Sequence, residues 1–288
     1  MKAILICPGA RSEVGLLSEA VPLSNVPALG RSLLEYWLVH LACSGVKQVL
    51  VLANDRSEQV QALVGKGERW GLTIQVVPES RELTAAQALL KYQDDIENAT
   101  GGNALVTIDH FPGLPEYPLF KSYADWFAGL QAWMPRAQTP DRVGVRQLAP
   151  GVWAGLHSHI SPGAQLHAPC WVGENVFVGA KAVLGAGTIV EDGSFIEPAA
   201  ELGNSYVGPD TFVGRYAEIK DSLAWGNTLI NWKTGSLARV PDPFLLCALR
   251  ASRARRSNGW LARLAELYAR NKEDAHLVWK HLLMNKEG

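Results

Sequence analysis

The sequence predicts an α/β domain, followed by a parallel β-helix and a helical tail. Strands alternate with helices over residues 1–145, which is typical of a parallel sheet covered by helices. An aliphatic residue recurs every six positions within residues 146–225, which is the signature of stacked β-coils. Residues 226–288 are basic and carry a helical apolar pattern. We therefore expect the chain of 288 residues to fall into these three parts.

The overall composition is that of an ordinary folded protein. Apolar residues make up 48% of the chain and charged residues 19%, which disfavours disorder, collagen and coiled coils. The net charge of −1 hides a division, because residues 1–145 carry −3, residues 146–222 carry −4 and residues 223–288 carry +6. The near-neutral total gives no reason to expect a nucleic-acid partner, and the positive charge is concentrated in the tail.

The apolar runs of the chain are short. None approaches the roughly 20 residues that a membrane span needs, and residues 1–8 are typical of a buried strand rather than a signal peptide. The cysteines form no CxxC pair, so we expect reduced thiols at Cys7, Cys43, Cys170 and Cys247. These features together predict a cytoplasmic protein.

Four short apolar runs of the first part are predicted to be strands. They are separated by segments with helical spacing of apolar residues. The predicted strands are residues 3–7, 49–52, 74–77 and 104–108, and the predicted helices are residues 33–43, 57–64 and 84–92. Ligands of such sheets bind beyond the carboxyl ends of the strands. The loops to inspect are therefore residues 8–15, 79–84 and 109–113.

The second part is a six-residue repeat. A mostly small residue lies two positions before each aliphatic one, which suits a narrow core. The aliphatic positions are Ile160, Leu166, Val172, Val178, Leu184, Val190, Ile196 and Leu202, then, after a slip of one residue, Val207, Val213 and Ile219. This pattern predicts three to four coils, and it resembles the left-handed β-helix of the hexapeptide-repeat proteins.

An α/β domain followed by hexapeptide repeats resembles the sugar-nucleotide pyrophosphorylases. These enzymes join a nucleoside triphosphate to a sugar 1-phosphate and release pyrophosphate. The resemblance rests on the segments MKAILI at 1–6, VPALGRSLLEY at 26–36, SGV at 44–46 and WGLTI at 70–74. With the repeat, it covers about residues 1–225, and it implies a nucleotidyltransferase-like, Rossmann-like sheet domain.

The resemblance implies a phosphate-binding loop at residues 8–13. The family sequence G-G-x-G-T-R is replaced here by Pro-Gly-Ala-Arg-Ser-Glu. Backbone N–H groups of a glycine-rich loop can cradle phosphates. Gly9, Arg11 and Ser12 are therefore the predicted nucleotide-binding residues. If the protein is an active transferase, Arg11 supplies the phosphate contact as its candidate catalytic residue.

Two cations that the family uses on phosphates are missing. Glu13 stands where the family keeps its arginine, so the charge there is reversed. Leu23 stands where the family motif P-K-P-L has its lysine. Cations stabilise the charge of a transferring phosphoryl group, so these two changes weaken the prediction of transfer.

The sugar and metal positions are altered as well. The family segment E-x-x-x-L-G-T-A-G-A aligns with residues 79–88, which keeps Glu79 near sugar or base but loses both glycines. Asp109 aligns with a metal-binding aspartate and would hold Mg²⁺ in an active enzyme; capping a turn is the alternative. The second metal aspartate falls on Leu119, and the sugar-binding subdomain that separates the two positions in the family is deleted.

These departures predict a catalytically degenerate relative in sugar-nucleotide or polysaccharide metabolism, acting by binding a nucleotide or sugar phosphate or by assembly. An active nucleotidyltransferase is the first alternative. The second is a hexapeptide-repeat acyltransferase, in which a histidine acts as general base. The candidates for that histidine are His157, His159 and His167, for which a metal site and an ordinary surface position are further interpretations.

The basic tail has two interpretations. Its arginines could contact a protein or an anionic membrane surface, or they could line the solvated face of a helix that packs on the β-helix or on a second subunit. The arginines are Arg250, Arg253, Arg255 and Arg256, and an amphipathic helix follows with Trp260, Leu261, Leu264, Leu267 and Tyr268, then a second at 274–284. A homo-oligomer is therefore one predicted assembly.

Overall fold

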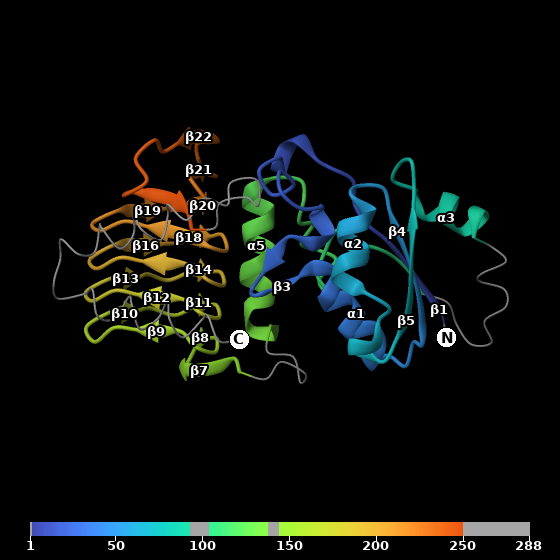
Figure 1. Cartoon of the computed structure of the whole chain (residues 1–288), viewed down its shortest axis with the longest axis horizontal. Helices are drawn as coiled ribbons and strands as arrows, with labels where there is room; N and C mark the ends of the chain where they lie inside the picture. The colour runs from blue at the N-terminus through green and yellow to red at the C-terminus, as the bar shows by residue number, and fades with distance from the viewer. Residues whose placement is uncertain (1, 93–103, 138–143, 250–288) are drawn as a thin grey trace, which may run out of the picture. The chain divides into compact units, whose positions relative to one another are not determined.

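The computed structural model describes residues 2–92, 104–137 and 144–249 (Figure 1). The described residues lie in one compact unit, Met1–Leu249. The predicted arginine cluster and the two predicted tail helices, residues 250–288, lie outside the described residues. No helix within the described ranges is both long enough and apolar enough to cross a bilayer.

The N-terminal part contains the predicted parallel sheet. Its strands are β1 (Lys2–Ile6), β4 (Gln48–Ala53), β5 (Thr73–Pro78) and β6 (Ala104–Thr107). All three pairings are parallel, and the strand order is β5-β4-β1-β6. The prediction of an α/β domain with a parallel sheet is therefore confirmed.

Helices and short turns connect these strands. The α-helices are α1 (Leu33–Cys43), α2 (Ser57–Val64), α3 (Ala85–Lys91) and α5 (Tyr123–Trp133). The 3-10 turns are η1 (Ser12–Val14), η2 (Leu23–Asn25), η3 (Glu68–Trp70) and η4 (Met134–Arg136). A short hairpin, β2 (Pro27–Ala28) and β3 (Arg31–Ser32), precedes α1.

The helices begin where a side chain can accept a hydrogen bond from the first turn. Ser32 and Glu35 form a reciprocal capping box at α1, and Thr84 and Gln87 form another at α3. Ser122 accepts from the backbone N–H of Asp125 at the start of α5. Thr84 is therefore the N-cap of α3. The helix begins at Ala85, one position later than the sequence predicts.

Alternate side chains of the central strand β1 point to opposite faces of the sheet. Ala3 and Leu5 belong to a large apolar cluster with α1 and α5, whereas Ile4 and Ile6 pack with Leu83 and other residues on the opposite face. Both faces are thus covered, which explains the continuous apolar run of this strand.

The repeat region, residues 152–225, contains three ladders of short strands. The first ladder contains β8 (Val152–Ala154), β11 (Cys170–Val172), β14 (Thr188–Val190), β17 (Tyr206–Val207) and β20 (Ser222–Trp225). The second contains β9 (His159–Ile160), β12 (Phe177–Val178), β15 (Phe195–Ile196) and β18 (Thr211–Val213). The third contains β10 (Gln165–Leu166), β13 (Val183–Leu184), β16 (Glu201–Gly203) and β19 (Glu218–Lys220).

The strands of each ladder pair in parallel at a regular interval. Val172 pairs with Val190, 18 residues on, and Val190 pairs with Val207, 17 residues on. Three six-residue units thus separate partners, and the one-residue slip seen in the sequence is the change from 18 to 17. The aliphatic ladder from Val172 onward is buried and forms an apolar cluster of its own.

Residues 226–249 differ from the prediction. They form strands β21 (Thr228–Asn231), β22 (Ser236–Arg239) and β23 (Leu246–Ala248), so the predicted helical tail is wrong for this segment. Two of the strands extend the first ladder as an antiparallel hairpin, and β7 (Arg146–Ala149) pairs antiparallel at the other end. A positive φ at Gly235 permits the turn of the hairpin, and edge pairing outweighs the local helical pattern.

A buried carboxylate joins the repeat region to the α/β part. Glu191 accepts hydrogen bonds from the backbone N–H groups of Leu29 (2.6 Å) and Gly30 (2.7 Å). Tyr206 donates its hydroxyl to the carbonyl of Pro27 (2.9 Å). Burial and the charge of Glu191 raise the pKa of Tyr206, which keeps this hydroxyl protonated as a donor. These contacts hold the β2–β3 hairpin against the repeat region.

Candidate functional site

The loops predicted to carry function leave the same edge of the parallel sheet. Cys7 donates its backbone N–H to Leu52 (2.9 Å), and Ile108 donates to Ile6 (2.9 Å). Glu79 donates its backbone N–H to Ala53 (2.8 Å) at the end of β5. The chain therefore leaves all four strands at one carboxyl edge, as expected for a ligand-binding edge.

At this edge an acidic side chain fills the predicted phosphate-binding loop. The Glu82 carboxylate accepts from the backbone N–H of Gly9 (2.9 Å) and from Arg11 Nη2 (2.6 Å). Arg11 Nη1 also donates to the Gly9 carbonyl (3.1 Å), so the guanidinium folds back on its own loop. Gly9 and Arg11, both predicted site residues, are thus brought together by Glu82, which the sequence analysis did not single out.

Gly9 occupies a position that leaves no room for a side chain. A Cβ there would stand 2.8 Å from Asn54 Nδ2 and 3.3 Å from Glu82 Oε2. Asn54 Oδ1 is buried and has no hydrogen-bond partner within the described ranges. Burial raises the pKa of the nearby Cys7 thiol to about 12, with the charge of Glu82 adding to the effect, so this cysteine stays protonated.

The other predicted residues of this loop face solvent. Ser12 donates its hydroxyl to Glu13 (3.1 Å). Backbone and Ser12 hydrogen bonds lower the pKa of Glu13, which is therefore a carboxylate at neutral pH. A negative charge thus stands at the position where the resemblance implies an arginine.

Glu79 is held in a separate cluster. Its carboxylate is 5% exposed and accepts from Lys91 Nζ through both oxygens (2.7 Å each), and Tyr92 donates its hydroxyl to it. Burial by itself would raise the pKa of Glu79, but the bonds from Lys91 and Tyr92 and the lysine charge outweigh it and lower the pKa. The structure therefore places Glu79 at the predicted edge but gives it a local ion-pair partner.

Asp109 lies just beyond β6 and is 53% exposed. Its carboxylate is 2.6 Å from His110 Nδ1, and its carbonyl accepts from the backbone N–H of Leu119 (2.8 Å). Within residues 2–92, 104–137 and 144–249, no group of three His, Cys, Asp or Glu side chains is arranged to hold a metal ion. Asp109 is thus a single carboxylate beside a histidine.

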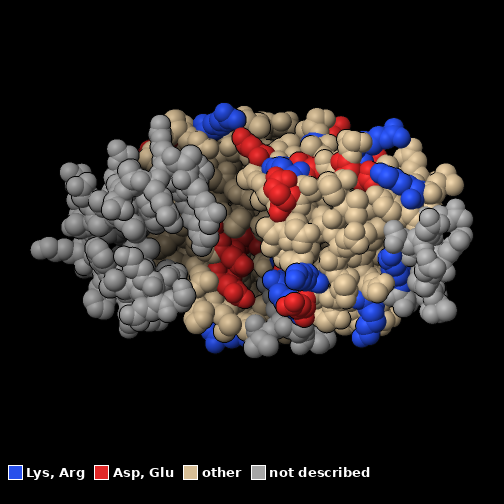
Figure 2. Space-filling view, turned by 45° about the vertical axis from the view of Figure 1, so that its right-hand side comes forward, with Lys and Arg blue, Asp and Glu red and all other residues tan. Residues whose placement is uncertain are grey.

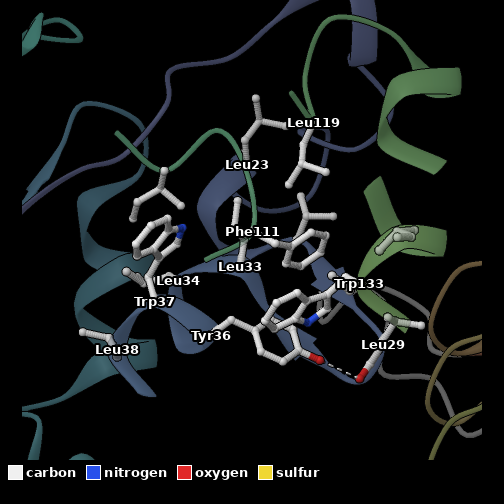
Figure 3. Close-up of a cluster of buried hydrophobic side chains, with 14 of the residues drawn as sticks. Leu23, Leu29, Leu33, Leu34, Tyr36, Trp37, Leu38, Phe111, Leu119 and Trp133 are labelled. Carbon is white, nitrogen blue, oxygen red and sulfur yellow. Dashed lines mark hydrogen bonds between the residues drawn. The ribbon is translucent and has the colours of Figure 1, made fainter. Parts of the chain in front are cut away.

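Leu23 and Leu119 are both fully buried in one apolar cluster (Figure 3). Phe111 stacks on Trp133 in the same cluster, with 5.0 Å between ring centroids, and Tyr36 meets both rings edge-on. Tyr36 donates its hydroxyl to the Leu29 carbonyl, 3.2 Å away. Buried leucine side chains therefore occupy the positions where the resemblance implies a lysine and an aspartate.

Leu119 also contacts α5 closely. A Cβ on Gly129 would overlap the Leu119 side chain, so this helix can approach only because position 129 is a glycine. Asp109 and Leu119 are ten positions apart, and the short connection buries Phe111 and Leu114 in the same core.

The three histidines of the repeat region lie at its first strands. The His159 ring stacks on Phe177 with 5.3 Å between centroids, and Phe177 stacks in turn on Phe195. His159 Nε2 is buried with no hydrogen-bond partner in the described part of the chain, and His157 has a positive φ of 57°. His167 donates its backbone N–H to Leu184 (2.8 Å). His159 thus belongs to an aromatic ladder, which is a packing role.

Figure 2 shows how charge is distributed on one face of the molecule. Acidic side chains gather near the middle of this face, and Lys and Arg occur in small groups, several of them beside acidic residues. Among the described atoms of this face there is thus no broad basic surface of the kind that phosphate-rich polymers require.

Comparison with known proteins finds one matching family and several distant relatives. Residues 2–117 match the family described as Nucleotidyl transferase. The chain is 27% identical over 94 residues to a glucose-1-phosphate thymidylyltransferase of Streptomyces griseus, covering 33% of this chain and 26% of that protein. It is 29% identical over 91 residues to a glucose-1-phosphate thymidylyltransferase of an Actinoplanes species, covering 31% of this chain and 30% of that protein.

The chain thus spans about a quarter to a third of the length of the curated relatives that it matches. The matched residues contain the whole parallel sheet and the three predicted ligand-binding loops, residues 8–15, 79–84 and 109–113. The N-terminal part of this chain is therefore similar to the nucleotidyl transferase family, with sugar nucleotidyltransferases among its relatives.

Proposed function

We propose that the chain is a sugar-nucleotide-pyrophosphorylase-like protein of sugar-nucleotide or polysaccharide metabolism whose transfer activity is lost or strongly impaired. It acts by binding a nucleotide or sugar phosphate, or by assembly. Its parts are a shortened nucleotidyltransferase-like domain at 1–145, a left-handed β-helix at 146–225 and a basic tail at 226–288. The regular pairing at 18 and 17 residues supports the β-helix.

The burial of Leu23 and Leu119 is the observation that carries this proposal. Both side chains are 0% exposed in the cluster of Figure 3. Phosphoryl-type transfer depends on cations and metal ions that neutralise developing charge. A lysine or an aspartate placed at these two positions would be buried in hydrocarbon without a partner, which is strongly unfavourable.

Of the two metal positions that the resemblance implies, only Asp109 has a carboxylate that could hold Mg²⁺. Magnesium is usually bound through one or two carboxylates together with phosphate oxygens. Here one carboxylate is paired with His110, and the second family position is Leu119. We therefore assign no catalytic step to a metal at this edge.

A nucleotide remains the ligand class that the carboxyl edge supports best. Gly9 offers a backbone N–H and Arg11 a guanidinium, and both already bind a carboxylate. Ser12 lies next to them in η1, whereas Glu79 forms an ion pair with Lys91. A second copy of the chain, and a protein or membrane surface for the basic tail, are the proposed partners. Nucleic acid is not among them.

The transfer reaction tests the loss of catalysis directly. The full chain is incubated with Mg²⁺, glucose 1-phosphate and, in separate reactions, dTTP, UTP, CTP, GTP or ATP, and pyrophosphate release is measured. The Streptomyces griseus relative serves as the positive control. We expect no release above background, while calorimetry detects binding of a nucleoside triphosphate. Pyrophosphate release at a rate comparable to the control would contradict the proposal.

No observation favours the acyltransferase alternative. A general base needs a ring nitrogen facing a substrate cleft, whereas the His159 ring lies flat against Phe177. Incubation with acetyl-coenzyme A is therefore expected to give no binding signal in the same calorimeter.

A further inference from the structure

Glu82 takes both hydrogen bonds that an anionic ligand of the loop would use. Gly9 donates its backbone N–H at 2.9 Å and Arg11 donates Nη2 at 2.6 Å, both to the same oxygen, Oε2. Charge-assisted bonds of this kind are what backbone N–H groups and arginine form with phosphate oxygens. The carboxylate thus stands where a phosphate oxygen would bind.

The backbone around Glu82 is anchored, but its side chain is not. Leu83 is buried against Ile4 and Leu50 on one face of the sheet, and Thr84 caps α3. The Glu82 side chain is 26% exposed and Arg11 37%, so the pair lies at the surface of the loop. Rotation of the glutamate side chain toward solvent would free both donors while the chain around it stays in place.

The shape of the loop suits an exchange of one anion for another. Gly9 has no side chain, and a Cβ there would meet Glu82 Oε2 at 3.3 Å. Asn54 also borders Gly9. Its buried Oδ1 accepts no hydrogen bond from the described residues. A ligand with a hydroxyl or protonated phosphate oxygen could supply a donor to it.

We propose that Glu82 is an internal competitor for the anion site at Gly9 and Arg11, and that a phosphate-bearing ligand binds there by displacing it. The inference rests on the proposed function, because it concerns the same loop. With Glu82 in place the site is neutral, since the carboxylate cancels the arginine charge. An incoming phosphate must both break the pair and approach a like charge, so the affinity of the native protein is held low.

Calorimetric titration of the full chain with inorganic pyrophosphate, and in parallel with dTTP, tests the competition. We expect Glu82→Gln to bind pyrophosphate about tenfold or more tightly than the native protein, because a like charge within a few ångströms is removed. Glu82→Ala, which also lacks the acceptor, is expected to gain at least as much. Circular dichroism and thermal melting establish that each variant is folded.

Two further variants make the test specific. Glu13→Gln makes the same charge change close to Arg11, yet Glu13 bonds Ser12 rather than Gly9. We expect its affinity to stay within about twofold of native, because Glu13 is exposed and occupies neither donor of the site. Adding Arg11→Gln to Glu82→Gln is expected to remove the gain, because the main cation of the site is then lost.

The outcomes separate this inference from the proposed function. Equal pyrophosphate affinities of the native protein and the two Glu82 variants would overturn the competition, and so would an equal gain in Glu13→Gln. Failure of every variant to bind pyrophosphate would show that the loop is not an anion site and would overturn it too. Release of pyrophosphate in the transfer assay contradicts the proposed function alone.

Discussion

The polar loop around Gly9, Arg11 and Glu82 and the apolar cluster around Leu23 and Leu119 have changed in opposite ways. The resemblance implies phosphate or metal contacts in both. The loop keeps its donors and satisfies them with a carboxylate from its own chain. The cluster has completely buried leucines at the two positions where the resemblance implies charged groups.

This difference teaches that two departures from the resemblance can differ in how easily they are reversed. In the loop, rotation of the Glu82 side chain alone would free the donors of Gly9 and Arg11, because a partly exposed ion pair contributes little to stability. In the cluster, restoring a charge would require a partner or water that the packing does not admit. On the proposed function, we therefore expect phosphate binding to be recoverable in this fold and the transfer chemistry not to be.

The largest expected effect comes from breaking the apolar cluster. Leu119→Asp restores the family's aspartate but buries a carboxylate among aromatic and aliphatic side chains. We expect a loss of about 4 kcal/mol or more in the free energy of unfolding, measured by urea denaturation. Leu119→Ala is the matched control and is expected to lose about 3 kcal/mol through the cavity alone. An Asp variant as stable as native would show that this region admits charge.

The contact between Leu119 and α5 tests how tightly the cluster is packed. Gly129→Ala places a methyl group onto Leu119, and we expect a loss of about 1–2 kcal/mol in spite of the better helix propensity of alanine. In the Leu119→Ala background the same substitution should be neutral or stabilising, because the overlap is gone. Additive losses in the double variant would contradict direct packing.

The pH dependence of stability tests whether Glu79 has a structural role rather than a ligand-binding one. Its folded pKa lies below the unfolded value of about 4.5, so its stabilising contribution is present above that pH and is lost as pH falls through the folded pKa. We expect Glu79→Gln to lose about 1 kcal/mol in the free energy of unfolding at pH 7. The free energy of unfolding of this variant should also change less between pH 6 and pH 3 than that of the native protein. Lys91→Met leaves the buried carboxylate without its cation, so we expect a larger loss at pH 7 and a smaller fall in stability toward acid than in the native protein. A native pH dependence in both variants would refute the assignment.

The smallest effect on stability is expected in the loop itself. Arg11→Gln removes the ion pair with Glu82, and we expect a change of about 0.5 kcal/mol or less in the free energy of unfolding, since the pair is partly exposed. Urea denaturation of the variant beside Leu119→Asp gives the contrast directly. A loss above about 2 kcal/mol in the free energy of unfolding would mean that the pair stabilises the fold rather than competing with a ligand.

Local pattern was enough to predict much of this molecule. The apolar runs at Ala3 and Val49 predict strands of the parallel sheet, because only a sheet covered on both faces tolerates such continuous runs. The six-residue period and its slip before Val207 predict the spacing of the strand ladders. The helical expectation for residues 226–249 was wrong, since antiparallel pairing of β21 and β22 at a free strand edge overrode a weak local preference.

The candidate site was only half visible in the sequence. Gly9 and Arg11 were found through the resemblance, but Glu82 was missed because nothing local relates positions 11 and 82. The one available signal was an acidic residue on another loop of the same sheet edge. Glu191, which joins the repeat region to Leu29, was missed for the same reason.

The sequence by itself determined the order of elements, the repeat period and the missing cations at Glu13 and Leu23. The element order and the repeat follow from residue identity and spacing along the chain, whereas the missing cations follow from the resemblance. Only the tertiary structure decided that Leu23 and Leu119 share one core and that Glu82 occupies the loop at Gly9. Such contacts join residues far apart in the chain, and they depend on strand order and packing that no local pattern encodes.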